Sequence, residues 1–200
     1  MKASIILGIF ALQLLCAAPL FAQGAPETKK KAPTIEEIRK DAQAGKAEGQ
    51  YLLAERYYYG GNVDKNLKEA LVWYRKAAAQ GHKGAKTMLG DMLYNGDGCD
   101  TNYKEAFPVL KEVAEGGDAQ AQFYLAKLYL NGWGTTKDES EAAKWMLKSA
   151  EKDILEAQEE MVKLYEKGIG VGRDAEKASY WKKRAEKSAL IEHMMDDYMY

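Results

Sequence analysis

The feature that most constrains the fold of this sequence is an internal repeat with a period of 36 residues. Four columns of side chains recur at that step along the 200-residue chain. They are an alanine column (Ala70, Ala106, Ala142, Ala178), a glycine column (Gly60, Gly96, Gly132, Gly168), an apolar column (Leu53, Leu89, Leu125, Met161) and a mostly aromatic column (Trp73, Val109, Trp145, Trp181). Units of this length bury their apolar faces by stacking on one another, so the period predicts a solenoid.

Each copy of the repeat predicts two helices. In the second half of the first copy, apolar residues at Ala70, Trp73, Tyr74, Ala77 and Ala78 are spaced three, four, seven and eight residues apart, which forms one stripe on a helix. We therefore predict an all-α chain with repeats at about 47–82, 83–118, 119–154 and 155–189. A lone second helix at 34–44 precedes them as a half repeat, and a helix near the C-terminus caps the last copy.

Residues suited to begin a helix precede each predicted second helix. This N-cap column contains Asn66, Asn102, Asp138 and Asp174. Their side chains can accept hydrogen bonds from the free N–H groups of the first helical turn. A glutamate follows three residues later in the first three copies, as in a capping box, whereas Lys177 takes that place in the fourth.

The stretch "LYEKGIGVGRD", residues 164–174, resembles a phosphate-binding loop because its glycines alternate. Gly168 and Gly170, however, occupy the same repeat positions as Gly132 and Gly134. A dinucleotide loop needs a strand before it, and here the pattern predicts a helix. These glycines are therefore predicted to end a helix and form a turn.

The N-terminal segment is typical of a secretory signal peptide. Lys2 precedes an uncharged apolar run, and small residues follow it, so we predict cleavage after Ala22 and a disordered, Lys-rich linker at 23–33. The alternative is an uncleaved anchor, for which the run is short. Cleavage also removes Cys16 and leaves Cys99 as the only cysteine, so no internal disulfide is expected. The predicted location is the periplasm or the exterior of the cell.

The charge balance argues against one class of function, the binding of polyanions through a basic surface. Lys and Arg number 29 and Asp and Glu number 30, which gives a formal net charge of −1. Nucleic-acid binding usually requires a basic excess or a basic stripe. No nucleic-acid partner and no membrane span after cleavage are therefore predicted.

The repeat resembles the Sel-one-like repeats, which are relatives of the tetratricopeptide repeat. The stretches "YLLAERYYYGGNVDKNLKEALVWYRKAAAQGH" and "GIGVGRDAEKASYWKKRAE" carry the resemblance, which covers about Thr34 to Ala189. It implies a right-handed α/α superhelix with a concave inner face and a role in protein–protein interaction. Copy two departs from the pattern: Val109 replaces its Trp, and Pro108 falls inside the second helix, where we expect a kink.

The resemblance also implies where a partner would bind, because the first helix of each pair lines the concave face in such solenoids. The predicted partner-binding residues are Tyr51, Glu55, Tyr58, Thr87, Asp91, Tyr94, Asn95, Phe123, Lys127, Leu130 and Asn131. Aromatic side chains among polar groups are common anchors for extended peptides. The alternative for these residues is ordinary packing against the next helix pair.

Catalytic and metal-binding patterns in the sequence are weak. Ser149 and Ser179 each begin a Ser-x-x-Lys match, but the other β-lactamase motifs are missing. The C-terminal stretch "HMMDDYMY" contains His193 and methionines, which suit copper, or it caps the last repeat as an amphipathic helix. We predict neither a catalytic residue nor a cofactor or metal.

The sequence thus predicts an exported adaptor or scaffold, with no enzymatic activity, that binds another protein or peptide through the concave face. The second hypothesis is a binder or hydrolase of β-lactam-like cell-envelope compounds. It rests on resemblance to secreted relatives with two cysteines per repeat, and this chain lacks those cysteines.

Overall fold

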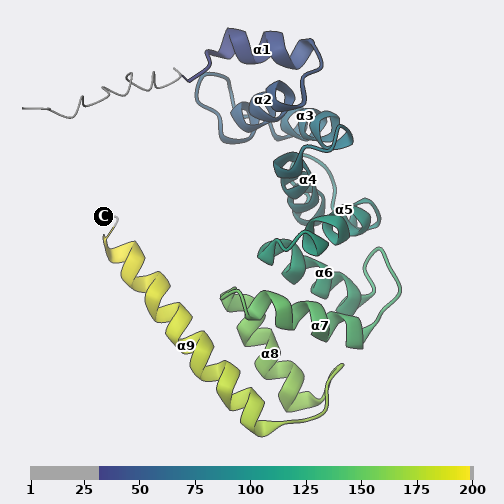
Figure 1. Ribbon diagram of the computed structural model, residues 1–200, viewed down its shortest axis with the longest axis vertical. Helices are drawn as coiled ribbons and strands as arrows, with labels where there is room; N and C mark the ends of the chain where they lie inside the picture. The colour runs from purple at the N-terminus through teal and green to yellow at the C-terminus, as the bar shows by residue number, and fades with distance from the viewer. Residues whose placement is uncertain (1–31, 199–200) are drawn as a thin grey trace, which may run out of the picture. The chain divides into compact units, whose positions relative to one another are not determined.

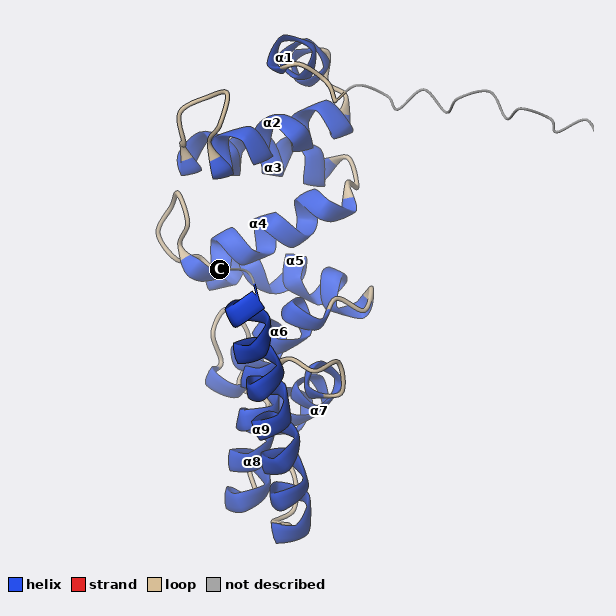
Figure 2. Cartoon of the chain, turned by 90° about the vertical axis from the view of Figure 1, so that its left-hand side faces the viewer, coloured by secondary structure: helices blue, strands red, loops and turns tan. Residues whose placement is uncertain are grey.

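The computed structural model describes residues 32–198 of the chain, and every regular element in this range is an α-helix (Figures 1 and 2). The helices are α1 (Ile35–Gln43), α2 (Ala47–Tyr59), α3 (Leu67–Ala79), α4 (Lys83–Asn95), α5 (Tyr103–Glu115), α6 (Ala119–Asn131), α7 (Glu139–Ala150), α8 (Leu155–Lys167) and α9 (Ala175–Tyr198). Each helix packs mainly against the next one in the chain. Helix α1 is the half repeat, and α2/α3, α4/α5, α6/α7 and α8/α9 are the four pairs, so the predicted α/α solenoid is confirmed. The predicted signal peptide lies outside the described residues.

The predicted N-cap residues begin the second helices. The side chains of Asn66, Asn102, Asp138 and Asp174 accept hydrogen bonds from the backbone N–H three residues later, at 3.1, 3.2, 2.9 and 2.9 Å. Thr34 at the start of α1 forms a complete capping box, since its own N–H also donates to the Glu37 carboxylate at 2.8 Å. These caps fix the first residue of each second helix and therefore the length of each turn.

The glycines of each repeat form the turn between the two helices. Gly96, Gly132 and Gly168 end α4, α6 and α8 in the left-handed conformation, with φ of 81°, 69° and 72°. Two residues later, a second glycine also has positive φ and faces the first turn of the preceding repeat's second helix. A Cβ on Gly134, for example, would overlap the carbonyl oxygen of Tyr103. The glycines therefore serve helix termination and contact between repeats.

The second helix of each of the first three repeats buries a large side chain at one repeat position and an alanine four residues later. Tyr74, Leu110 and Met146 are almost inaccessible to solvent, and so are the alanines four residues after each. In the fourth repeat the same positions are Lys182 and Glu186, and both are exposed. At these two positions the surface of α9 is therefore charged, whereas the same positions of the other second helices are apolar and buried.

The last helix continues beyond the point where the other second helices end. Gly81, Gly117 and Asp153 follow α3, α5 and α7 with φ of 86°, 94° and 64°, and the equivalent residue in the fourth repeat is Ala189. Alanine disfavours the left-handed conformation, so α9 has no stop signal there. The predicted capping helix is therefore continuous with the second helix of the fourth repeat, as Figure 1 shows.

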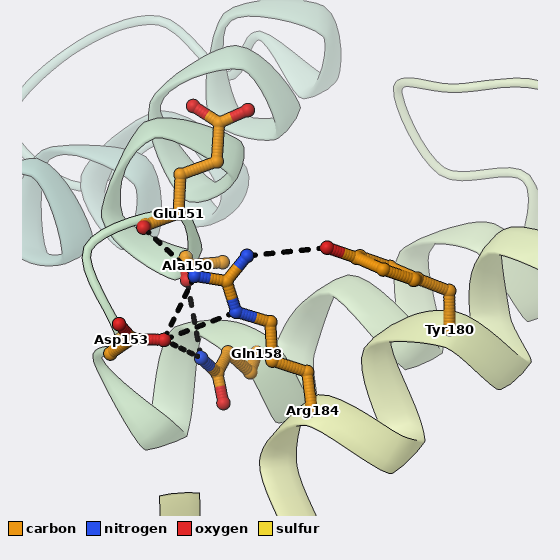
Figure 3. A network of polar contacts seen from close by, with 6 residues as sticks. All are labelled: Ala150, Glu151, Asp153, Gln158, Tyr180 and Arg184. Carbon is orange, nitrogen blue, oxygen red and sulfur yellow. Dashed lines mark hydrogen bonds and ion pairs between the residues drawn. The ribbon is translucent and has the colours of Figure 1, made fainter. Parts of the chain in front are cut away.

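A network of polar contacts surrounds Asp153, the one residue other than glycine with positive φ in the described chain (Figure 3). The Arg184 guanidinium on α9 donates to the Asp153 carboxylate at 2.9 and 3.1 Å and to the Glu151 carbonyl at 3.1 Å. The Gln158 amide on α8 donates to the same carboxylate and to the Ala150 carbonyl. These bonds join α7, α8 and α9 at the one repeat boundary where no glycine forms the turn.

Pro108 lies within α5, and the helix runs without a break through it. Its side chain is exposed, and Leu110, two residues later, is buried in the core. The irregularity expected at this residue therefore does not end the helix or remove its apolar face from the core.

Candidate functional site

The predicted partner-binding residues lie on the first helices of the first three pairs. Nine of the eleven are half-buried, and Asn95 and Asn131 are exposed. Helix α2 carries Tyr51, Glu55 and Tyr58; α4 carries Thr87, Asp91, Tyr94 and Asn95; α6 carries Phe123, Lys127, Leu130 and Asn131. We call this set the first-helix face. None of its members is fully buried, so each presents part of its side chain to solvent.

On α2 the first-helix face combines tyrosines with carboxylates. The Tyr51 hydroxyl donates to Glu55 at 2.7 Å, and its ring stacks on His82 with centroids 4.4 Å apart. The hydrogen bond to Glu55, followed by burial, raises the pKa of Tyr51 to about 12. One helical turn after Glu55, the Tyr58 hydroxyl donates to Asp97 in the loop after α4, at 3.3 Å. The second contact links the first repeat to the second through polar atoms at the surface.

Between α4 and α6 the face is built around Asp91 and two stacked tyrosines. The rings of Tyr94 and Tyr124 stack with centroids 4.3 Å apart, and the Asn95 amide donates to Asp91 at 3.0 Å. Burial raises the pKa of Asp91, and the charges of Asp97 and Asp118 also raise it, while hydrogen bonds from Tyr124 and Asn95 act in the opposite direction. Asp91 is therefore a partly desolvated carboxylate beside other negative charges.

The remaining members of the face are less closely connected. Lys127 forms an ion pair of 3.7 Å with Glu160 on α8, and the Phe123 ring lies 5.8 Å from that of Tyr124. Thr87 and Asn131 each donate to a carbonyl of their own helix, at 3.4 and 2.9 Å. Leu130 packs against the apolar core of the last two repeats. This part of the prediction combines surface residues with residues that also serve packing.

Three residues of this region were not predicted from the sequence. Tyr124 contacts Asp91, Tyr94 and Phe123, yet its repeat column otherwise holds Leu52, Met88 and Glu160 and gave no signal of a surface role. Asp97 lies in a turn rather than on a helix, and His82 was assigned only to the end of a repeat. His82 caps α4 through Nδ1 at 3.0 Å from the Ala85 N–H. The contacts of Tyr124 and Asp97 with the neighbouring repeat depend on how the repeats pack, which the 36-residue pattern alone does not give.

Comparison with protein families gives four matches along the chain. The model described as Sel1 repeat matches residues 47–82, 84–107, 119–154 and 156–188. The chain belongs to the Sel1 repeat family. The second match is the shortest and ends immediately before Pro108, where copy two departs from the repeat pattern. Sel1 repeat proteins are in general scaffolds for protein–protein interaction and are typically not enzymes.

Solved structures of other Sel1 repeat proteins are similar to this chain. One is the protective antigen c5321 of uropathogenic Escherichia coli, with 34% identity and a TM-score of 0.70 over 78% of this chain and 33% of that chain. Another is a Sel1 repeat protein from Oxalobacter formigenes, with 36% identity and a TM-score of 0.68 over 77% of this chain and 63% of that chain. The chain thus spans less than two thirds of each. No curated protein matches it.

Two of the remaining candidates for chemistry, Ser149 and Cys99, take part in the packing of the solenoid. Ser149 is buried and donates to the Ala119 carbonyl at 2.8 Å, so its hydroxyl joins α7 to α6. Cys99 is a half-buried free thiol, and burial raises its pKa, which disfavours the reactive thiolate. Among the side chains that the structure describes, no three from His, Cys, Asp or Glu are grouped to hold a metal ion. Within residues 32–198, no helix is long and apolar enough to cross a membrane.

Proposed function

We propose that this Sel1 repeat chain is an exported adaptor that binds a segment of another protein along its first-helix face. The observation that carries the proposal is the series of half-buried aromatic side chains on α2, α4 and α6, which lie among carboxylates and amides at the surface. Such side chains offer large apolar contact area together with hydrogen-bonding groups, as binding hot spots do.

The packing of the solenoid supports this use of the face. Consecutive helices hold α2, α4 and α6 in place through a continuous core that includes Ala85, Leu89 and Leu125. A partner would therefore meet a surface that is already ordered, and the entropy of ordering it is not lost on binding. The family's general role in protein–protein interaction agrees with this assignment.

Affinity capture with matched variants tests the proposal. The bait is the mature chain, and the test variant combines Tyr58→Ala, Tyr94→Ala and Phe123→Ala. The control variant combines Val72→Ala, Tyr180→Ala and Leu190→Ala, which removes exposed apolar side chains from the second helices α3 and α9. Cell-envelope extract of the source organism supplies the partners, and mass spectrometry identifies them.

The proposal predicts a partner that the mature chain and the control variant retain and the test variant loses. Circular dichroism must show equal helicity for the three baits, because Tyr58 and Tyr94 also contact neighbouring side chains. Equal retention by both variants would place binding elsewhere and contradict the proposal.

Export is a separate part of the proposal and has its own test. The supporting observation is the apolar segment that follows Lys2 in the sequence. We expect N-terminal sequencing of the periplasmic or secreted protein to begin at Gln23. A cytoplasmic protein that retains Met1 or Lys2 would contradict export.

A further inference from the structure

Three carboxylates lie on α2, on α4 and in the turn that follows α4: Glu55 and Asp91 of the first-helix face, and Asp97. Within residues 32–198, none of the ion pairs includes Glu55, Asp91 or Asp97. Glu55 and Asp97 accept hydrogen bonds from Tyr51 and Tyr58 instead. We call Glu55, Asp91, Asp97 and Tyr58 the acidic cluster.

Tyr58 joins the members of this cluster. It lies one helical turn after Glu55 on α2, and its hydroxyl reaches Asp97 across the gap to the second repeat. Burial raises the pKa of Tyr58, and the charges of Asp97 and Asp91 raise it further, so both carboxylates act on the same hydroxyl. Two carboxylates of the second repeat thus act on a tyrosine of the first repeat.

A buried hydroxyl beneath the cluster lacks a hydrogen-bond partner. Tyr74 on α3 is fully buried, and its hydroxyl oxygen contacts no donor or acceptor in the described chain. Its ring centroid lies 6.0 and 6.4 Å from those of Tyr51 and Tyr58. Burial raises the pKa of Tyr74, and Glu55 is the foremost of the charged neighbours that add to this effect. The Tyr74 ring thus packs beside those of Tyr51 and Tyr58, and its hydroxyl has hydrogen-bonding capacity left over.

The surface beside Asp91 is hollow. A pocket of about 210 Å³ lies between α4 and α6, and Asp91, Asp118, Thr87 and Tyr124 contribute to its lining. Asp118 uses one carboxylate oxygen to cap α6, at 2.7 Å from the Ala121 N–H. The pocket thus offers an extended side chain space next to a partly desolvated carboxylate.

Positive groups suit this environment in two ways. Carboxylates hold ammonium and guanidinium groups by charge-assisted hydrogen bonds, and tyrosine rings attract cations through their faces. An ammonium group already approaches this site, since the Nζ atom of Lys65 lies 5.9 Å from the centroid of the Tyr58 ring. Lys65 forms no ion pair with the acidic cluster, which therefore keeps its charge for a ligand.

We propose that the protein partner presents a lysine or arginine side chain to the acidic cluster, with Tyr58 at its rim and the Tyr74 hydroxyl beneath it. This inference rests on the proposed function and specifies the chemistry of the segment that is bound. The bound side chain would provide the positively charged partner that Glu55, Asp91 and Asp97 lack in the free chain.

The test is an NMR titration of the mature, ¹⁵N-labelled chain with three small probes. N-acetyl-arginine amide and N-acetyl-lysine amide carry the two candidate cations, and N-acetyl-citrulline amide has nearly the shape of the arginine probe without its charge. The test variant combines Glu55→Gln, Asp91→Asn and Asp97→Asn. The control variant combines Glu156→Gln, Glu159→Gln and Glu166→Gln, which changes the net charge equally at exposed positions of α8.

The proposal predicts saturable shifts around the acidic cluster with at least one cationic probe. These shifts persist in the control variant and disappear in the test variant and with citrulline. Four results would overturn the proposal. They are equal shifts with the citrulline probe, shifts confined to other surfaces, shifts that survive in the test variant, and no shifts at all. If the amides fail while capture depends on Tyr58, Tyr94 and Phe123, the cationic subsite is wrong and the adaptor proposal stands. If the amides bind but no partner is captured, the cationic subsite stands and the adaptor proposal is wrong.

Discussion

Replacing Gly134 with alanine tests how the repeats are held together. Gly134 has a φ of 69°, and a Cβ there would overlap the carbonyl oxygen of Tyr103 at the start of α5. The left-handed conformation costs alanine about 1–2 kcal/mol. Relief of the overlap requires movement of backbone at the boundary between two repeats, for which overpacking costs of about 1–3 kcal/mol are typical. We therefore expect Gly134→Ala to lower the free energy of unfolding by about 3 kcal/mol.

Two other glycines separate the contributions. Gly45 has a φ of 81° with no atom within 4 Å of an added Cβ, so Gly45→Ala should lose only the conformational part, about 1 kcal/mol. Gly172 has neither a positive φ nor a close neighbour, and Gly172→Ala should gain about 0.5 kcal/mol by restricting the unfolded chain.

The assay is urea unfolding followed by circular dichroism at the helix band. The three variants should rank Gly172→Ala above the parent chain, Gly45→Ala below it and Gly134→Ala lowest. For a chain of this size, about 3 kcal/mol corresponds to a melting temperature lower by roughly 6–12 °C. If Gly134→Ala is no less stable than Gly45→Ala, the second glycine column does not mediate a close contact between repeats, and the reasoning is refuted.

Three further predictions concern single side chains. Tyr74→Phe should raise the free energy of unfolding by about 1 kcal/mol in urea titrations, because it removes a buried hydroxyl without a partner; a loss of stability would show that the hydroxyl is bonded. Because the pKa of Asp91 is raised, the folded chain holds the Asp91 carboxyl proton more tightly than the unfolded chain does. The ionised carboxylate therefore lowers the free energy of unfolding at neutral pH, and this loss of stability disappears as the pH falls below about 4. Asp91→Asn should therefore raise the melting temperature at pH 7 but not at pH 3, and a larger gain at pH 3 would contradict this. Asp138→Ala should cost about 1 kcal/mol through loss of the α7 cap, and an unchanged urea midpoint would argue against that cap.

The sequence predicted the repeated elements well because their determinants are local. The N-cap column and the first glycine column act within a few residues, so their 36-residue spacing carries over directly to helix boundaries. The continuation of α9 also has a local determinant. Ala189 stands where Gly81 and Gly117 end their turns, and α9 continues for that reason.

Contacts between repeats were harder to predict. The repeat pattern predicts that Gly134 lies in the turn, but it does not predict the contact of Gly134 with Tyr103, because that contact depends on how the second repeat approaches the third. Tyr124 was missed for the same reason, since its contact with Tyr94 joins the third repeat to the second. The eleven predicted site residues lie on the expected helices, yet the pairing of Tyr58 with Asp97 requires the three-dimensional arrangement. Binding by these residues stays a prediction.

Site-specific photocrosslinking tests the central claim most directly, because it reports which face of the folded chain the partner touches. Benzoylphenylalanine is placed at position 87 on α4, within the first-helix face, or at position 144, which is exposed on the second helix α7. Each protein is irradiated in the cell envelope of the source organism. We expect a crosslinked partner with the probe at position 87 that excess unlabelled chain competes away, and none with the probe at position 144. A crosslink only at position 144, or the same crosslink at both positions, would contradict the claim that the first-helix face binds the partner.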